Sequence, residues 1–443
     1  MAVYLAAAVP LLIVSPVANR AELRCAEVVQ GMVSSGDWLV PRFDGEVRLN
    51  KPPLSYWTGA VASVALGQVS LAALRVPSLL AAAGLLLVTY AWGRRIGGAR
   101  LGLAAAACLA AMELTIAYGR RGVADMQLAL YGNLALLCFD RLLVAPRLAW
   151  RVGFGLCLGL ALLAKATAGL MLVGVPVAVI LTLQRRWRAA LAPRNLVWIA
   201  LALGLGLAWY VAIVRLLPGS LERLKADLLL PVGSDEAAYP GAAHYNPPWF
   251  HLESLLKGAV PALVLLPWAV RRAASTRCWR DLPRLRFVFV VFASLFVAFS
   301  LLPQKQKHYM LPLLPALAIL LADGALARSR LDPDAFARLA RRLGYAAAVC
   351  ATLLMAWTAG WELVVYADVP AALTLAAGGV LAGAALAVAA RRGRPAHVGG
   401  AAVAAMLAIM LLYGFLIEPH QPPPGDLPPA TAATSAPSPE AAR

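Results

Sequence analysis

Charged residues and cysteines are scarce in this chain, and each scarcity excludes a class of protein. Of its 443 residues, 14% are charged and 61% are hydrophobic, and the mean hydropathy is +0.73. A soluble domain needs more polar surface than this composition supplies. Of the six cysteines, only Cys25 falls in a loop that the topology below assigns to the outer face, so no intramolecular disulfide is expected there. Composition therefore predicts an all-α, polytopic integral membrane protein.

Acidic residues are also few, at 22 against 40 Lys and Arg, which gives a net charge of +18. A basic excess can indicate nucleic-acid binding, but here the basic residues form short clusters between apolar runs rather than one face or tail. Nucleic acid is therefore not an expected partner. HExxH, CxxC and P-loop motifs are absent from the sequence. No cofactor or metal is required by these residues, and a bound divalent ion remains a possibility.

Apolar segments long enough to span a bilayer follow one another along the chain. Helices are the expected solution, because lipid offers no partner for unpaired backbone groups. The first segment starts almost at Met1 without a basic leader, so we expect it to be an uncleaved helix. We count about 13 candidate spans, at 3–17, 75–92, 101–118, 126–139, 152–164, 167–183, 195–214, 255–270, 287–302, 310–327, 344–363, 370–390 and 398–417.

Arginine placement predicts the orientation, because Lys and Arg gather on the cytoplasmic side of membrane proteins. With the N-terminus inside, alternate connections such as 271–286 and 328–342 are rich in arginine and poor in acids. The opposite set contains most of the acids and the long loops 18–58 and 215–254. We therefore expect the chemically rich loops to face outward.

The loop at residues 18–58 concentrates five carboxylates and several basic side chains. Connectors are usually short, so a long charged loop beside a membrane is more typical of a reaction site. Within it, Lys51 precedes two prolines that restrict the backbone and hold the cation in place. Lys165 interrupts the apolar stretch 152–183, where a charge is costly unless it lines a cavity or reaches the interface. Snorkelling to lipid headgroups is the alternative for both lysines.

Four segments of the sequence together resemble one family, and they occur in the family's order over roughly residues 1–330. The family is that of the bacterial aminoarabinose transferases and related members of the protein O-mannosyltransferase superfamily. The first outer loop is matched by ELRCAE at 22–27, GDWLVP at 36–41 and KPPLSYW at 51–57; the second acidic loop by RGVADMQL at 121–128; the GLA-hydrophobic-Lys segment by GLALLAKA at 159–166; and the HYLLPLLP motif by HYMLPLLP at 308–315.

The resemblance implies a membrane glycosyltransferase of GT-C architecture, with interfacial helices in the first outer loop. Such an enzyme takes a sugar from a polyprenyl-phosphate carrier at the periplasmic face of the bacterial inner membrane. The implied acceptor is lipid A, or another envelope glycolipid or glycan. A protein O-glycosyltransferase of the same superfamily is the nearest alternative. A polyprenyl-lipid or solute transporter is the alternative from another class, but the charges lie in outward loops and no inverted repeat is evident.

Transfer from a lipid phosphodiester needs a carboxylate for the acceptor and cations for the leaving phosphate. Glu22 and Asp125 are the expected catalytic carboxylates, although Ala21 stands where many relatives carry Asp. The alternative for each is a structural acid paired with a nearby arginine. For His308 and Tyr309 the alternative is an interfacial aromatic belt. The expected donor-phosphate residues are Lys51, Lys165, His308 and Tyr309, and the expected substrate-loop residues are Arg24, Arg121, His244 and Trp249.

We divide the chain into a transferase core at 1–330, C-terminal transmembrane helices at 331–417 and a disordered Pro- and Ala-rich tail at 418–443. Asp332 and Asp334 have the spacing of a metal-binding DxD motif, but their inward loop favours helix capping. Glycines within the spans indicate close helix packing rather than dinucleotide binding; they are Gly153, Gly155, Gly159, Gly204 and Gly206.

Overall fold

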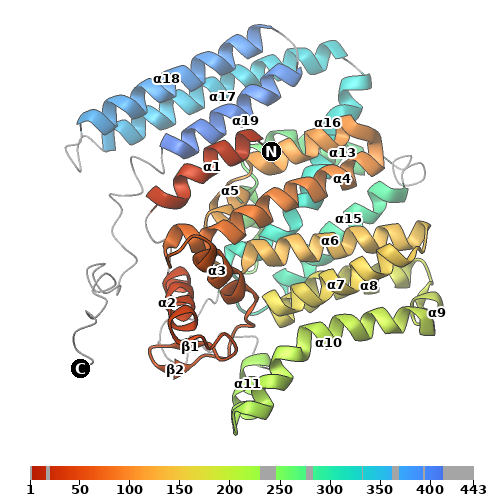
Figure 1. Ribbon diagram of the computed structural model, residues 1–443. Helices are drawn as coiled ribbons and strands as arrows, with labels where there is room; N and C mark the ends of the chain where they lie inside the picture. Colours follow the sequence, from red (N-terminus) through yellow and green to blue (C-terminus); the bar gives the residue numbers. More distant parts are fainter. Residues whose placement is uncertain are drawn as a thin grey trace.

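The computed structural model describes residues 2–15, 20–229, 246–275, 283–331, 333–361, 369–392 and 395–412. Helices dominate this part of the chain and run roughly side by side (Figure 1). In chain order the elements are α1 (Ala2–Val14), α2 (Arg20–Ser35), β1 (Arg42–Phe43), β2 (Glu46–Val47), α3 (Leu54–Ala65), α4 (Leu71–Ala111), α5 (Glu113–Gly119), α6 (Asp125–Val144), α7 (Leu148–Ala164), α8 (Ala166–Leu183), α9 (Trp187–Ala190), α10 (Pro193–Leu216), α11 (Ser220–Leu229), α12 (Phe250–Gly258), η1 (Ala262–Leu265), α13 (Leu266–Ala273), α15 (Pro283–Ser300), η2 (Lys307–Leu313), α16 (Leu314–Leu331), α17 (Pro333–Trp361), α18 (Val369–Arg391) and α19 (Pro395–Leu412).

Within the described residues, seven helices are long and apolar enough to cross a membrane. The bent pair Phe250–Gly258 and Ala262–Ala273, at 99°, gives an eighth if it counts as one span. The prediction of a polytopic α-helical membrane protein is confirmed, whereas the count of about 13 spans is not. Part of the difference lies in α4, which joins two helices across a kink at Gly97 and Gly98. Gly98 has φ +84°, a conformation that favours glycine.

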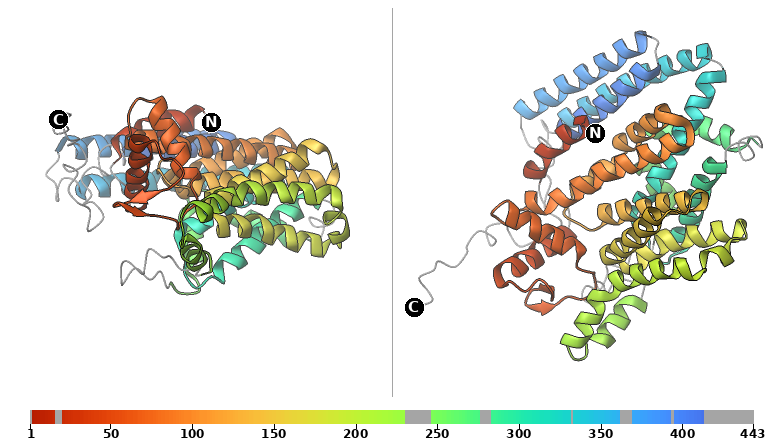
Figure 2. Two further views of the ribbon diagram at one scale, coloured as in Figure 1. Left: turned by 60° about the horizontal axis from the view of Figure 1, so that its bottom comes forward. Right: turned by 45° about the vertical axis from the view of Figure 1, so that its right-hand side comes forward.

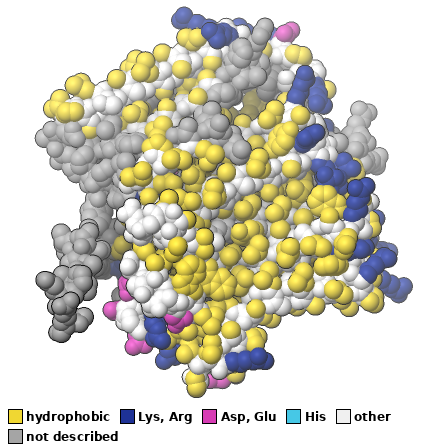
Figure 3. All heavy atoms as spheres, in the orientation of Figure 1, with side chains coloured by type: hydrophobic (Ala, Val, Ile, Leu, Met, Phe, Trp, Pro, Cys, Tyr) yellow, Lys and Arg dark blue, Asp and Glu magenta, His cyan; other side chains and the backbone are white. Residues whose placement is uncertain are grey.

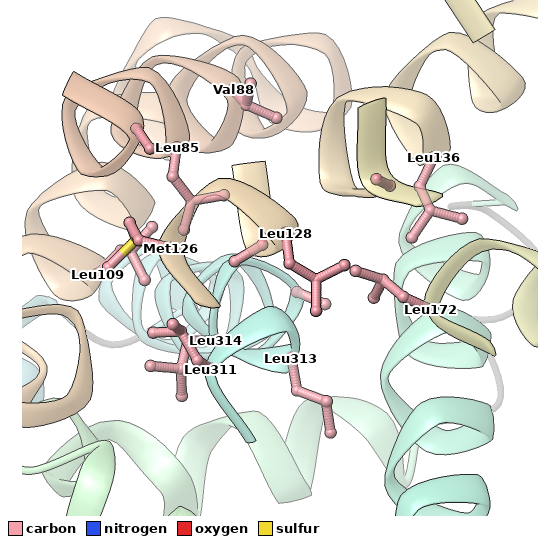
Figure 4. Close-up of a cluster of buried hydrophobic side chains, with 14 of the residues drawn as sticks. Leu85, Val88, Leu109, Met126, Leu128, Leu136, Leu172, Leu311, Leu313 and Leu314 are labelled. Carbon is pink, nitrogen blue, oxygen red and sulfur yellow. The ribbon is translucent and has the colours of Figure 1, made fainter. Parts of the chain in front are cut away.

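The centre of the molecule is α6, which packs against α4, α7 and α8 (Figures 1 and 2). Figure 4 shows leucines and other apolar side chains from α4, α6, α8, η2 and α16 meeting in one buried cluster. Met126 and Leu128, in the first turn of α6, belong to this cluster and are 0% and 5% exposed. The start of α6 is therefore fixed by the core.

The helices α17, α18 and α19 pack on one another and lie along one side of the molecule (Figure 1). They reach the rest of the structure chiefly through α19, which contacts α1 and α4. None of the predicted site residues lies in these three helices.

Close packing at glycines is confirmed between α7 and α10. A Cβ atom built on Gly155 would lie 2.8 Å from the carbonyl oxygen of Trp198, and one on Gly206 would lie 2.6 Å from Leu162 Cβ. Gly204 differs, because a Cβ atom there would have nothing within 4 Å. The glycines at the interface let the two helix backbones approach each other.

The predicted outer loop is a folded unit made of α2, the β1–β2 hairpin and α3, grouped at one end of the molecule (Figure 2). Two tryptophans attach the residues before β1 to the helices. Trp57 Nε1 donates to the Trp38 carbonyl oxygen at 2.6 Å, and Trp209 Nε1 donates to the Leu39 carbonyl oxygen at 2.9 Å. The loop is thereby held against α3 and α10.

Basic side chains gather along the edge of the molecule opposite this loop (Figure 3). The connection that carries α9 lies on that edge (Figure 1), and its Arg185, Arg186 and Arg188 are exposed. Acidic side chains on the face in Figure 3 lie mostly near the outer loop. The charge asymmetry read from the sequence is thus present across the fold.

Candidate functional site

The carboxylate of Asp125 lies in a partly buried polar cluster at the start of α6. Lys165 Nζ is 2.7 Å from Asp125 Oδ1 and 3.2 Å from His308 Nε2. His308 Nε2 is in turn 3.5 Å from Asp125 Oδ1. The three side chains are 11%, 23% and 14% exposed for Asp125, Lys165 and His308. Three of the predicted segments therefore meet at one place.

Lys165 reaches the cluster because α7 and α8 are separate helices that fold back on each other. The residue has extended backbone angles, φ −159° and ψ 96°, between the two helices. A Cβ atom at Gly169 would lie 2.5 Å from the Ala161 carbonyl oxygen, so glycine permits this close return. The side chain turns inward to Asp125 instead of extending to lipid headgroups. The predicted division of the stretch 152–183 into two helices is confirmed.

His308 and Tyr309 stand in η2, the short 3-10 segment that precedes α16. The rings of His308 and Tyr309 are 4.9 Å apart, and Lys165 Nζ is 6.0 Å from the centre of the Tyr309 ring. An ammonium group has donors only, so His308 Nε2 accepts from Lys165 and is the nitrogen without hydrogen. The ring of His251 packs on Tyr309 at 5.8 Å. Aromatic rings thus form one wall of the cluster.

Two further cations stand near the cluster. Lys51, half-buried after the outer hairpin, is close enough to interact electrostatically with both Asp125 and His308. Arg121 lies over the ring of Tyr118, 4.7 Å from its centre, and also acts on His308. Lys51 and Arg121 add two positive charges beside the Asp125–Lys165 ion pair. Such an environment suits an anionic ligand.

Glu22 occupies a different position from Asp125. It is fully buried, and Arg75 holds both of its oxygens, with Nε 2.8 Å from Oε1 and Nη2 3.0 Å from Oε2. The amide of Gly122 also donates to Oε1 at 2.8 Å. Glu22 is therefore paired with an arginine, as the structural alternative expects, but this arginine lies 53 positions away, in α4. The catalytic role of Glu22 stays a prediction.

The remaining predicted residues lie elsewhere or outside the described part. Arg24 lies over the ring of Phe43, 5.9 Å from its centre. Trp249 is 64% exposed just before α12. His244 and the tail at 418–443 fall outside the described residues, as does Asp332.

Sequence reasoning missed three polar residues around the site. Arg75 was visible as a lone charge at the start of an apolar run, which marks a functional or paired group in a membrane protein. Glu113 begins α5 near Lys307 and Arg121, and burial raises the pKa of its carboxyl group. Gln127 Nε2 donates to Thr58 Oγ1 at 2.7 Å and links α6 to α3. This last contact has no local sequence signal.

Among the described residues, no three His, Cys, Asp or Glu side chains come together as a metal site would require. The expectation that no metal or cofactor is needed stays a prediction.

Comparison with known families matches residues 50–213 to the model described as dolichyl-phosphate-mannose-protein mannosyltransferase. The chain is 32% identical over 311 residues to undecaprenyl phosphate-alpha-4-amino-4-deoxy-L-arabinose arabinosyl transferase 2 of Sodalis glossinidius, covering 68% of this chain and 54% of that protein. It is 30% identical over 324 residues to the corresponding transferase of Pseudomonas aeruginosa, covering 70% and 56%. The chain spans about half the length of these curated relatives.

Solved structures show the same fold. ArnT from Cupriavidus metallidurans superposes with a TM-score of 0.74 in its apo state and 0.76 when bound to undecaprenyl phosphate. Each comparison has 21% identity and covers 94% of this chain and 76% of the other. The predicted resemblance is confirmed: this chain is similar in sequence to the bacterial aminoarabinose transferases, its fold is that of ArnT, and its residues 50–213 match the mannosyltransferase family model.

Proposed function

We propose that the chain transfers a sugar from a polyprenyl-phosphate carrier to a lipid or glycan acceptor of the bacterial envelope, such as lipid A. The observation that carries this proposal is the cluster of Asp125, Lys165 and His308 with Lys51 beside it. It places one carboxylate and an excess of cations where four family-like segments converge. The names of the relatives, and the undecaprenyl phosphate bound to ArnT, support the same donor class.

The proposed reaction is a displacement at the anomeric carbon of the sugar. The acceptor hydroxyl oxygen forms a bond to that carbon, and the carbon–oxygen bond to phosphate breaks. The electron pair stays on the leaving polyprenyl phosphate, and the hydroxyl proton passes to a base. Asp125 is the proposed base, since it is the carboxylate held at the centre of the cluster.

The cations have different proposed tasks because their surroundings differ. Lys165 is 2.7 Å from Asp125, so we assign it chiefly to fixing that carboxylate, and His308 Nε2 holds the Lys165 ammonium group in place. Lys51 and Arg121 both act electrostatically on His308, and we assign them to bind the donor phosphate and to stabilise the negative charge that grows on it. Tyr309 packs beside His308 and Lys165, and we assign it to the same site.

The proposed site faces the periplasm, across the inner membrane from the exposed arginines. The basic edge in Figure 3 lies away from the outer loop, and cytoplasmic faces carry the excess of Lys and Arg. Reporter fusions at the α9 connection and at the β1–β2 hairpin test this orientation. A reporter at the β1–β2 hairpin that is found in the cytoplasm would contradict this orientation.

Mass spectrometry of envelope lipids in a deletion strain tests the function. Deletion should remove a sugar from the acceptor and accumulate its polyprenyl-phosphate donor, and wild type but not Asp125→Asn should restore the profile. Since the relatives are named for 4-amino-4-deoxy-L-arabinose, that sugar is the first donor to follow. An unchanged lipid profile accompanied by a transport defect would favour a transporter instead.

Protein O-glycosylation is the second candidate, favoured by the description of the matched family at residues 50–213. The same deletion strain separates the two. Loss of sugar from periplasmic proteins, with lipids unchanged, would assign a protein acceptor.

A further inference from the structure

Glu22 and Arg75 form an ion pair that water does not reach, with side chains 0% and 1% exposed. The guanidinium binds the carboxylate through two nitrogens, at 2.8 and 3.0 Å. This fork-shaped contact fixes the orientation of both groups as well as their distance. The two residues lie 53 positions apart, in α2 and α4, so the pair joins separate elements.

Each partner also holds a backbone segment. Glu22 Oε1 accepts from the amide of Gly122 at 2.8 Å, in the loop at 120–124 that joins α5 to α6. Arg75 Nη1 donates to the carbonyl oxygens of Leu12 at 3.1 Å and Ser15 at 2.6 Å, at the end of α1. Four parts of the chain thus meet at this one pair.

Residues of α4 also contact the loop at 120–124. A Cβ atom at Gly122 would lie 3.0 Å from Leu74 Cβ, so the loop backbone rests directly on α4. Ser78 Oγ, also in α4, donates to the Val123 carbonyl oxygen at 3.2 Å. A shift of the loop would break the contact with Glu22 as well as these packing contacts.

We infer that Glu22 and Arg75 are positioning residues, which set the loop at 120–124 so that Arg121 and Asp125 face Lys51. The inference rests on the proposed function of that site. Arg121 lies in the loop and Asp125 follows it directly, so the position of the loop decides where both groups stand. The Glu22 carboxylate itself accepts hydrogen bonds from buried donors on both oxygens, which is a poor arrangement for taking a proton from a bound acceptor.

The structure offers a matched control further along α4. Arg95 of α4 and Asp140 of α6 form a second buried pair, with Nε 2.6 Å from Oδ2 and side chains 7% and 5% exposed. Glu22→Gln and Asp140→Asn each remove one negative charge from a buried pair. Only the first pair adjoins the proposed site.

The experiment compares both variants and wild type, purified in lipid nanodiscs, for melting temperature and for sugar transfer per folded molecule. Both variants should melt at lower temperature. Only Glu22→Gln should transfer more slowly, by roughly 10- to 100-fold, the scale of a misplaced reacting group. Its pH–rate profile should keep the wild-type shape, because Asp125 remains the base. Arg75→Lys keeps the positive charge but loses the two-nitrogen contact with Glu22. It should therefore also melt at lower temperature and transfer more slowly.

Three outcomes decide the matter. Equal transfer by Glu22→Gln, Arg75→Lys and Asp140→Asn overturns the positioning role. Loss of one limb of the pH–rate profile in Glu22→Gln also overturns it, because Glu22 would then be the base. Absence of transfer in the wild-type protein overturns the proposed function itself, so the two failures are distinguishable. If Glu22→Gln does not fold, Arg75→Lys carries the same test.

Discussion

Replacing Lys165 by methionine separates the stability of the candidate site from its chemistry. The variant keeps much of the apolar stem of lysine but leaves the Asp125 carboxylate, 11% exposed, without its 2.7 Å partner. Breaking a buried ion pair on one side costs about 3–5 kcal/mol of unfolding free energy, because an uncompensated charge remains. We expect Lys165→Met to lose that amount, and transfer with it.

The double variant Asp125→Asn with Lys165→Met removes both charges, so its loss of stability should be smaller than the sum of the two single losses. For groups in contact, the expected coupling is about 0.5–3 kcal/mol. Transfer should still be absent, because the proposed base is gone. Stability and activity therefore diverge in the double variant.

Denaturant unfolding in mixed micelles, followed by tryptophan fluorescence, measures the free energy of unfolding of the two single variants and the double variant relative to wild type. Mass spectrometry measures the polyprenyl phosphate released by each protein. Additive losses, equal within about 0.5 kcal/mol, would show that the two charges are not coupled. Transfer by the double variant at the wild-type rate would refute the assignment of the site.

Three further expectations follow from single residues. Gly169→Ala should destabilise the α7–α8 return by about 1–3 kcal/mol, because the new Cβ atom would lie 2.5 Å from the Ala161 carbonyl oxygen. Gly174→Ala in the same helix should not, since its Cβ atom would lie 3.7 Å from Leu170 Cδ1; thermal melting compares the two variants. Cys25 is 5% exposed and burial raises the pKa of its thiol to about 12, so maleimide should label it at pH 8 only after unfolding. Burial raises the pKa of Glu113 above 4.5, so the wild type should lose stability as the pH rises through the folded pKa. Glu113→Gln should remove that loss of stability, so the variant should melt at higher temperature than wild type above pH 4.5 but not below it. A gain in melting temperature that does not depend on pH would contradict the raised pKa of Glu113.

The sequence predicted the membrane class, the folded outer loop and the break at Lys165, because these depend on local apolar runs, prolines and isolated charges. It also predicted that Asp125, Lys165 and His308 belong to one site, through their family-like segments. It did not predict that Lys165 is paired with Asp125, since the two lie 40 positions apart.

Glu22 shows why the remaining contacts of the site could not be predicted from the sequence. Its neighbours in sequence include two arginines, yet its partner is Arg75 and its third contact is Gly122, 100 positions away. Such contacts depend on how α2, α4 and the loop at 120–124 pack, which local patterns do not encode. The number of spans differs for another reason, since the 99° bend between α12 and the η1–α13 segment divides the predicted span 255–270 into two shorter helical segments.

Reconstituted transfer tests the central claim most directly. The purified chain in nanodiscs is given a polyprenyl-phosphate-linked aminoarabinose and lipid A, and both products are quantified by mass spectrometry. We expect one modified acceptor for each polyprenyl phosphate released, with the rate lowered roughly 100- to 10,000-fold in Asp125→Asn and unchanged per folded molecule in Asp140→Asn. Acceptor-dependent release that is equally fast in Asp125→Asn, or no release by the wild-type protein with this donor and acceptor or with a protein acceptor, would contradict the account.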